Sequence, residues 1–302
     1  MTITKTKTLR RRLSTTSAAG IILATSALAL AQTPTDKSGY APVNGLNLYY
    51  EIHGAGKPLI LLHGGLGSTS LFHNLIPVFS KARQVIAVDL QAHGRTADID
   101  RPITYEAMAD DIAALMKYLN IAKADILGYS LGAGVALQTT IRHPELVGKL
   151  VVVSTAYKRD GWHTDVLAAM AQMGPAAAEQ MKPSPIYKTY ASVAPRPADW
   201  TTLVTKIADL LHKDYDWSQG VAAIKSPTMI VFGDADAVRP THIVEFFGLL
   251  GGGKKDGGWD GSGIPNARLA ILPGVTHYNI LESPLLAQAV APFLEIPPEG
   301  SK

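Results

Sequence analysis

Six short apolar segments, spaced along the chain and separated by loops and helical patterns, constrain the fold most strongly. Because most of them are continuous apolar runs rather than alternating ones, they are typical of strands buried on both faces of a sheet. Strands that alternate with helical segments predict an α/β fold with a mostly parallel central sheet and helices on both faces. The segments are residues 58–62, 84–90, 124–129, 149–154, 227–232 and 268–272.

Between the segments, several stretches have the apolar spacing of amphipathic helices. Residues 70–80 predict one helix, and Thr104 is placed to cap a second that runs to about residue 119. A third helix is expected from Leu131 to about residue 143, before Pro144, and a fourth at residues 284–294. Residues 46–52 alternate between apolar and polar side chains and predict a half-buried strand, preceded by a linker at residues 32–41.

The regular alternation stops between residues 157 and 223, where no buried strand pattern occurs. This stretch contains tryptophans, tyrosines, methionines and five prolines, and we interpret it as a helical cap inserted into the sheet domain. Its large side chains could form an ordinary core, or some could line a pocket over the carboxyl ends of the strands. We therefore expect core segments at 32–156 and 224–302 on either side of a cap at 157–223.

The glycine-rich residues 251–263 predict a surface loop, with a role in shaping the mouth of a pocket as the alternative. The stretch lacks the Gly-Lys-Ser/Thr signature of a phosphate-binding loop.

The first 31 residues predict a secretory signal peptide. A basic region ends at Arg12, a small apolar run follows, and residues 29–31 form an Ala-x-Ala cleavage site. Residues 10–13 loosely resemble a twin-arginine export signal, and an amphipathic N-terminal helix is the structural alternative. We expect a periplasmic or secreted protein with no stable membrane anchor after cleavage.

The net charge of +3 comes from this leader. Residues 1–31 hold five of the 28 basic residues and no acid, which leaves 23 basic against 25 acidic residues in the remainder. The charge therefore gives no argument for nucleic-acid binding. The chain has no cysteine, which excludes disulfides and thiolate metal sites, and its scattered histidines do not have metal-ligand spacing. We expect neither a metal nor a cofactor.

Residues 128–132 read Gly-Tyr-Ser-Leu-Gly and stand between a predicted strand and a predicted helix. This arrangement indicates a nucleophile elbow, a sharp turn that exposes Ser130 and needs small residues on both sides. The N–H of Leu131 would face an oxyanion that forms beside the serine. Asp236 and His277 follow at two later strand ends, and a serine hydroxyl needs such a base and carboxylate to become a nucleophile.

With these motifs the chain resembles the α/β-hydrolase superfamily, in particular its esterase and lactonase relatives with one cap, over nearly all of residues 42–296. The motifs are His63-Gly64-Gly65, Gly128-Tyr129-Ser130-Leu131-Gly132, Gly233-Asp234-Ala235-Asp236 with Pro240, and Gly274-Val275-Thr276-His277. Residues 89–96 also look like the Asp-x-x-Gly-x-Gly-x-Ser loop of the family, with Ala92 and His93 altering its usual glycines or their neighbours.

The resemblance implies that Ser130 is the nucleophile, His277 the base and Asp236 the acid, with Asp234 as the competing carboxylate. It implies the amides of Gly65 and Leu131 as the oxyanion hole, with Leu66 as the alternative to Gly65. His63 is expected to be a structural hydrogen bonder.

The expected function is hydrolysis of a small carboxylic ester or lactone through an acyl-enzyme. A carbon–carbon bond hydrolase, a cofactor-free perhydrolase and a non-catalytic ligand-binding protein remain alternatives. The sequence leaves the substrate and the oligomeric state open.

Overall fold

The computed structural model describes residues 37–295, in which eight strands form one sheet in the order β1-β2-β4-β3-β5-β6-β7-β8. The pairs from β4 to β8 are parallel, whereas β1 and β2 are antiparallel to their neighbours. The predicted α/β class is confirmed. The strands are β1 (Lys37–Val43), β2 (Leu46–His53), β3 (Lys57–Leu62), β4 (Arg83–Val88), β5 (Ala124–Tyr129), β6 (Val147–Val153), β7 (Thr228–Ala235) and β8 (Ala267–Thr276).

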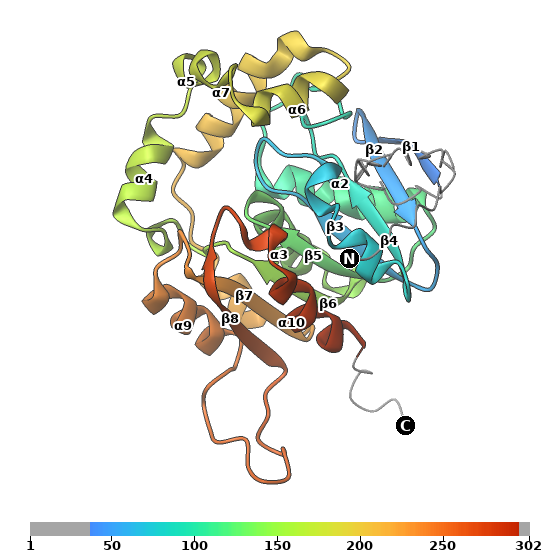
Figure 1. The fold of residues 1–302 in the computed structure, drawn as a ribbon. Helices are drawn as coiled ribbons and strands as arrows, with labels where there is room; N and C mark the ends of the chain where they lie inside the picture. Colours follow the sequence, from blue (N-terminus) through green and yellow to red (C-terminus); the bar gives the residue numbers. More distant parts are fainter. Residues whose placement is uncertain (1–36, 296–302) are drawn as a thin grey trace, which may run out of the picture. The chain divides into compact units, whose positions relative to one another are not determined.

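Helices cover both faces of this sheet (Figure 1). Along β3, Ile60 and Leu62 join the core beneath α2 and α3, while Leu59 and Leu61 join the core beneath α1 and α10. This alternation explains why β3 is apolar at each of the four positions from Leu59 to Leu62. The helices outside the insertion are α1 (Ile76–Phe79), α2 (Tyr105–Tyr118), α3 (Leu131–Arg142), α9 (Pro240–Leu249) and α10 (Pro284–Glu295).

Five further helices lie between β6 and β7, where the sequence predicted a helical insertion. Trp200 and Tyr190 are buried in a cluster that is continuous with the core beneath α2 and α3, and the indole of Trp200 donates to the carbonyl of Ala178 at 2.9 Å. The helices are α4 (Thr164–Ala171), α5 (Pro175–Met181), α6 (Pro185–Val193), α7 (Trp200–Leu211) and α8 (Ser218–Ala223). Short 3-10 turns complete the fold: η1 (Thr69–Phe72), η2 (Pro144–Leu146), η3 (Arg159–Gly161), η4 (Pro197–Asp199) and η5 (Ile280–Glu282).

The predicted linker at residues 32–41 is wrong in its second half, because β1 begins at Lys37 and pairs with β2. The two strands are joined at Asn44 and Gly45, which both have positive φ (49° and 84°). Asn-Gly is the strongest short-range hairpin signal, so the sequence contained the information that this interpretation missed.

The single helix predicted at residues 70–80 is also wrong. The chain forms η1, turns at residues 73–75, and starts α1 anew, with Pro77 in its first turn. A proline at that position is compatible with a helix start and incompatible with a continuing helix, because it has no N–H to donate backwards.

The glycine-rich segment at residues 250–266 contains no helix or strand, as predicted. It joins the end of α9 to the start of β8 and projects away from the cap helices (Figure 1), with Trp259 fully exposed. The alternative role at a pocket mouth is therefore wrong for the pocket described below.

The predicted signal peptide at residues 1–31 lies outside the described residues. Among residues 37–295, the structure contains no helix with the length and apolar character that a membrane span requires.

Candidate active site

Ser130 occupies the tight turn between β5 and α3, with φ 52° and ψ −116°. The glycines on either side of it are sterically required. A Cβ at Gly128 would lie 2.2 Å from the carbonyl oxygen of Gly132, and a Cβ at Gly132 would lie 2.1 Å from the carbonyl oxygen of Leu62. The strained backbone is characteristic of a nucleophile elbow, which presents the serine side chain beyond the end of the strand.

The structure brings Ser130, His277 and Asp236 together from three strand ends. Ser130 Oγ lies 3.1 Å from His277 Nε2, and His277 Nδ1 lies 3.3 Å from Asp236 Oδ1. With Nδ1–H donating to the carboxylate, Nε2 is free to accept the serine proton. This geometry can support nucleophilic catalysis.

Asp236 is buried, and each of its two carboxylate oxygens interacts with two hydrogen-bonding partners. Oδ2 accepts hydrogen bonds from Ser154 Oγ at 2.6 Å and Gly233 N at 3.2 Å, while Oδ1 also accepts from Val238 N at 3.2 Å. Burial alone would raise the pKa of Asp236. The hydrogen bond and charge of His277, with the other donors, outweigh burial and hold this pKa below its ordinary value.

Asp234, the competing carboxylate, does not contact His277. Its side chain is exposed, and Oδ1 accepts a hydrogen bond from Val275 N at 3.2 Å. Asp234 thus braces β7 against β8 at the point where their pairing is irregular.

Two residues that support this arrangement were missed by the sequence analysis. The Tyr129 hydroxyl donates to the backbone oxygen of His277 at 2.8 Å, and Ser154 binds Asp236 from the end of β6 with φ 54°. Tyr129 occupies a variable position of the Gly-x-Ser-x-Gly motif, and Ser154 follows an apolar strand. Neither carries a signal until the fold places it beside the histidine or the acid.

The backbone of Gly64 and Gly65 passes directly over the elbow. A Cβ at Gly64 would lie 3.4 Å from Ser130 Cβ, and one at Gly65 would lie 3.9 Å from Leu131 Cβ. Among residues 37–295, the N–H groups of Gly65, Leu66 and Leu131 have no hydrogen-bond acceptor. Unpartnered amides beside a serine are what an oxyanion hole requires.

His63 is fully buried, and both ring nitrogens are used: Nδ1 contacts the carbonyl of Gly64 at 2.8 Å and Nε2 accepts from Leu90 N at 3.1 Å. Burial, and then the neighbouring His93, lowers the pKa of His63 to about 3. His63 is therefore a neutral structural residue, as expected.

Asp89, at the end of β4, fixes the segment that follows Gly64-Gly65. Its Oδ1 accepts from Thr69 N at 2.7 Å and its Oδ2 from Arg95 N at 2.8 Å. Burial raises the pKa of Asp89 to about 6, although these donors and the charge of Arg95 act in the opposite direction.

A cavity of about 250 Å³ opens beside Ser130 and His277. Its other walls come from Tyr105 on α2, from Trp162, and from α4 and α7 of the insertion. Met170 and Met173 line it, so the pocket-lining interpretation of the cap methionines is confirmed for these two. No Lys, Arg, Asp or Glu is among the described residues that line it.

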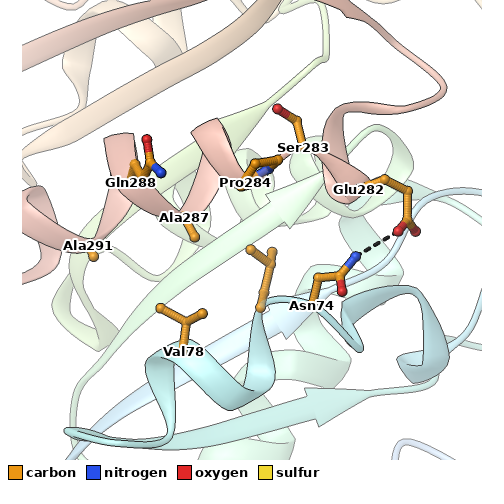
Figure 2. A pocket seen from close by; sticks show the side chains of 9 residues that line it. Asn74, Val78, Glu282, Ser283, Pro284, Ala287, Gln288 and Ala291 are labelled. Carbon is orange, nitrogen blue, oxygen red and sulfur yellow. Dashed lines mark hydrogen bonds between the residues drawn. The ribbon is translucent and has the colours of Figure 1, made fainter. Parts of the chain in front are cut away.

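A second, larger cavity of about 530 Å³ lies between α1 and α10 (Figure 2). Its acid, Glu282, accepts a hydrogen bond from Asn74 at 2.6 Å. Its serine, Ser283, has no histidine partner among the described residues. This cavity therefore lacks the groups for acyl transfer that the smaller one contains.

The described residues include no group of three or more His, Asp or Glu side chains that could hold a metal ion. The histidines outside the site make separate contacts, such as His143 with Asp110 at 2.8 Å and His242 with the backbone N–H of Tyr157 at 3.2 Å.

Comparison with known families agrees with this architecture. A family model described as the alpha/beta hydrolase fold matches residues 57–184. The sn-1-specific diacylglycerol lipase ABHD11 of Danio rerio is 34% identical over 133 residues, which make up 42% of this chain and 42% of that protein. The chain thus spans less than half the length of that relative.

Two solved structures share the fold over most of their length. E-2-(acetamidomethylene)succinate hydrolase has a TM-score of 0.68 at 20% identity, and covers 86% of this chain and 99% of its own. The enol-lactonase from Burkholderia xenovorans has a TM-score of 0.63 at 22% identity, and covers 85% of this chain and 100% of its own. At such identities the likeness concerns the fold alone.

Proposed function

Because the chain belongs to the α/β-hydrolase superfamily, we propose that it is a serine hydrolase that cleaves a small, uncharged carboxylic ester or lactone. One observation carries the proposal: the hydrogen-bonded series Ser130–His277–Asp236 opens onto an apolar cavity beside unpartnered backbone amides.

In the first half-reaction, Ser130 Oγ attacks the carbonyl carbon while His277 Nε2 takes the serine proton. The carbonyl oxygen becomes an oxyanion, to which the N–H groups of Leu131 and Gly65 donate; Leu66 is the alternative to Gly65. Asp236 keeps the Nδ1–H tautomer of His277 and stabilises the imidazolium. The intermediate collapses, the C–O bond breaks, and the alcohol leaves with the proton from His277.

In the second half-reaction, water replaces the alcohol. His277 accepts one water proton as the oxygen attacks the acyl carbon, and returns it to Ser130 Oγ as the ester bond to the serine breaks. The carboxylic acid is released, and no cofactor enters this balance.

The cavity supports a small and uncharged substrate. Its volume of about 250 Å³ lies below the roughly 300–1,000 Å³ that is usual for drug-sized ligands. A buried carboxylate needs a paired charge, and no cationic side chain is among the described lining residues. This distinguishes the proposed substrate from the succinate in the name of the structural neighbour.

We further propose that the protein is exported to the periplasm or beyond the cell. The support is the basic, apolar and Ala-x-Ala pattern of residues 1–31.

The test compares wild type and Ser130→Ala on p-nitrophenyl esters from acetate to decanoate and on simple lactones. We expect hydrolysis of the short esters, and a loss of at least about 10⁴-fold in kcat for Ser130→Ala. Ser192→Ala, at an exposed serine of α6, is the matched control and should keep wild-type activity. Folded wild-type protein that cleaves none of these compounds, or an unaffected Ser130→Ala variant, would contradict the proposal.

A further inference from the structure

Tyr105 is the first residue of α2, and its side chain reaches the same cavity as Ser130. The Thr104 side chain caps this helix by accepting from Ala107 N at 3.0 Å, so the start of the helix is fixed. Tyr105 is only 8% exposed. A side chain with a polar group therefore lines a pocket whose other walls are largely apolar.

The hydroxyl of Tyr105 has no hydrogen-bond partner among residues 37–295, which sets it apart from the other buried tyrosines. Tyr49 donates to Glu51 at 3.0 Å, Tyr157 to Glu245 at 3.4 Å, and Tyr190 to the carbonyl of Arg196 at 3.4 Å. The buried side-chain atoms without a partner among the described residues are His93 Nε2 and His242 Nδ1, so the Tyr105 hydroxyl oxygen is not sealed in the core and remains accessible. Because its side chain lines the cavity, this unpartnered hydroxyl is available to a ligand bound there.

Packing holds the ring in place. A Cβ at Gly134 would lie 2.4 Å from Tyr105 Cε1, so α3 presses against one edge of the ring. Trp217 contacts the ring edge-on with centroids 4.9 Å apart, and Tyr215 lies at 5.9 Å. The hydroxyl is thus held in place before any ligand binds.

Burial raises the pKa of Tyr105 well above its ordinary value. The phenol therefore stays protonated at any pH at which the protein would work. It can donate a hydrogen bond, and its complement is an acceptor oxygen.

We propose that Tyr105 determines substrate specificity by donating a hydrogen bond to a second, uncharged oxygen of the ester, away from the bond that is cleaved. The inference rests on the proposed function and narrows it to neutral esters or lactones that carry an ether, keto or hydroxyl oxygen. A carboxylate is a poor occupant because one phenol cannot offset the burial of a full charge. A volume of about 250 Å³, equal to that of about eight water molecules in the liquid, limits the substrate to a small one.

The test uses pairs of esters in which one oxygen replaces one methylene. For the acyl side these are p-nitrophenyl methoxyacetate against butanoate and 3-methoxypropanoate against pentanoate. For the alcohol side the pair is 2-methoxyethyl acetate against butyl acetate. For each pair, the ratio of kcat/KM values is measured in wild type, Tyr105→Phe and Tyr118→Phe. Tyr118 lies on the same helix with an exposed side chain and is the matched control.

We expect Tyr105→Phe to lower the preference for the oxygen-bearing ester by about three- to tenfold in at least one pair, the effect of one hydrogen bond. The ratio in Tyr118→Phe should equal that of wild type. The thermal midpoint of Tyr105→Phe should not fall, because the lost hydroxyl has no partner within the described chain. Equal ratios in wild type and Tyr105→Phe for every pair would overturn the inference.

Calorimetric binding of the same esters to Ser130→Ala and to Ser130→Ala/Tyr105→Phe separates this inference from the proposed function. If wild type hydrolyses none of the esters, the proposed function fails, while selective binding that depends on Tyr105 would still support the role of its hydroxyl. No binding to either protein, or binding without discrimination in both, would overturn the inference itself.

Discussion

The two ends of the parallel strands are built in opposite ways. At the carboxyl ends, β3, β4, β5 and β6 are each followed by a non-glycine residue with positive φ: Leu66 (61°), Ala92 (65°), Ser130 (52°) and Ser154 (54°). Such backbone is uncommon outside glycine and asparagine and is costly. Amides without partners occur at the same end. The carboxyl ends therefore have a strained backbone and N–H groups without hydrogen-bond partners, as is common at active sites.

At the amino ends, by contrast, the buried carboxylate of Asp125 has hydrogen-bond and ion-pair partners on both oxygens. Asp125 at the start of β5 accepts hydrogen bonds from Arg83 and from Lys149 N, and pairs with Lys57 Nζ at 2.9 Å. Arg83 Nη1 and Lys149 Nζ also bind the last carbonyls of α10 at 2.8 Å. This cluster closes the sheet against the end of α10. Groups that stabilise the fold and groups that can react are thus separated along the strand direction.

Asp236→Asn should reduce activity more than any substitution at the amino ends of the strands. Ser154 and Gly233 donate to Oδ2, so the amide oxygen of the asparagine is expected there and its NH₂ faces His277. His277 would then carry its proton on Nε2 and could no longer accept the proton of Ser130. We expect kcat to fall by about 10⁴-fold with the fold intact. The measurement is steady-state kinetics on the best ester, with circular dichroism as the check on folding.

Asp234→Asn is the control for this prediction, because Asp234 lies two residues away and contacts only the backbone of Val275. It should keep wild-type kinetics. If Asp234→Asn lost activity as severely as Asp236→Asn, the assignment of the acid would be wrong.

At the opposite end, Asp125→Ala should affect stability and not chemistry. The substitution leaves the buried guanidinium of Arg83 without its carboxylate, and it also removes the acceptor of the Lys149 backbone N–H and the partner of the Lys57 ammonium. Breaking such a buried pair typically costs about 3–5 kcal/mol. Urea unfolding measures this loss, and kcat/KM per folded molecule should match wild type. If Asp125→Ala does not fold, Asp125→Asn keeps the shape and should show a smaller loss of the same kind. Reduced kcat/KM in the folded protein would refute the separation of the two ends.

A third prediction concerns the pH dependence of stability at Asp89. Its pKa is about 6 in the folded protein and near 4 in an unfolded chain, so the folded state binds more protons between these values. Stability from this group is present below about pH 4 and is lost as the pH rises through 6, by about 3 kcal/mol in total. The unfolding free energy of wild type minus that of Asp89→Asn should therefore fall between pH 4 and 7. A difference that stays constant or rises with pH would show that Asp89 is ionised throughout.

The sequence predicted the features of the fold and the site that depend on local patterns better than those that depend on contacts between distant residues. The apolar runs predicted the strands, and Gly128 and Gly132 predicted the elbow, because both signals are local. The site also required Asp236 and His277, which are 41 residues apart and meet only through the pairing of β7 with β8. For these the resemblance to a family, and not spacing, supplied the prediction.

The parts that could not be predicted depend on contacts across the fold. Tyr129 and Ser154 support the histidine and the acid from positions with no pattern of their own. That the Tyr105 hydroxyl has no hydrogen-bond partner among the described residues can be recognised only once the positions of its neighbours are known. In contrast, the sequence contained a signal for β1, because Asn44-Gly45 is a typical hairpin turn. The failure to predict β1 was therefore an error of interpretation.

The backbone strain after β4 can be tested at Ala92, which is buried with φ 65°, and there we expect only a small change in stability. A non-glycine residue in this left-handed conformation costs about 1–2 kcal/mol of stability, and glycine avoids this cost. Glycine also makes the unfolded chain more flexible, which lowers stability by about 0.4–1 kcal/mol. Ala92→Gly should therefore raise the unfolding free energy by about 0.5 kcal/mol. Ala113→Gly, in the interior of α2 where φ is helical, should lower it by about 1 kcal/mol. Denaturant melts of the two variants give the comparison. If Ala92→Gly destabilised the protein as much as Ala113→Gly, the positive φ after β4 would carry no strain, and the contrast between the two strand ends would rest on the unpartnered amides alone.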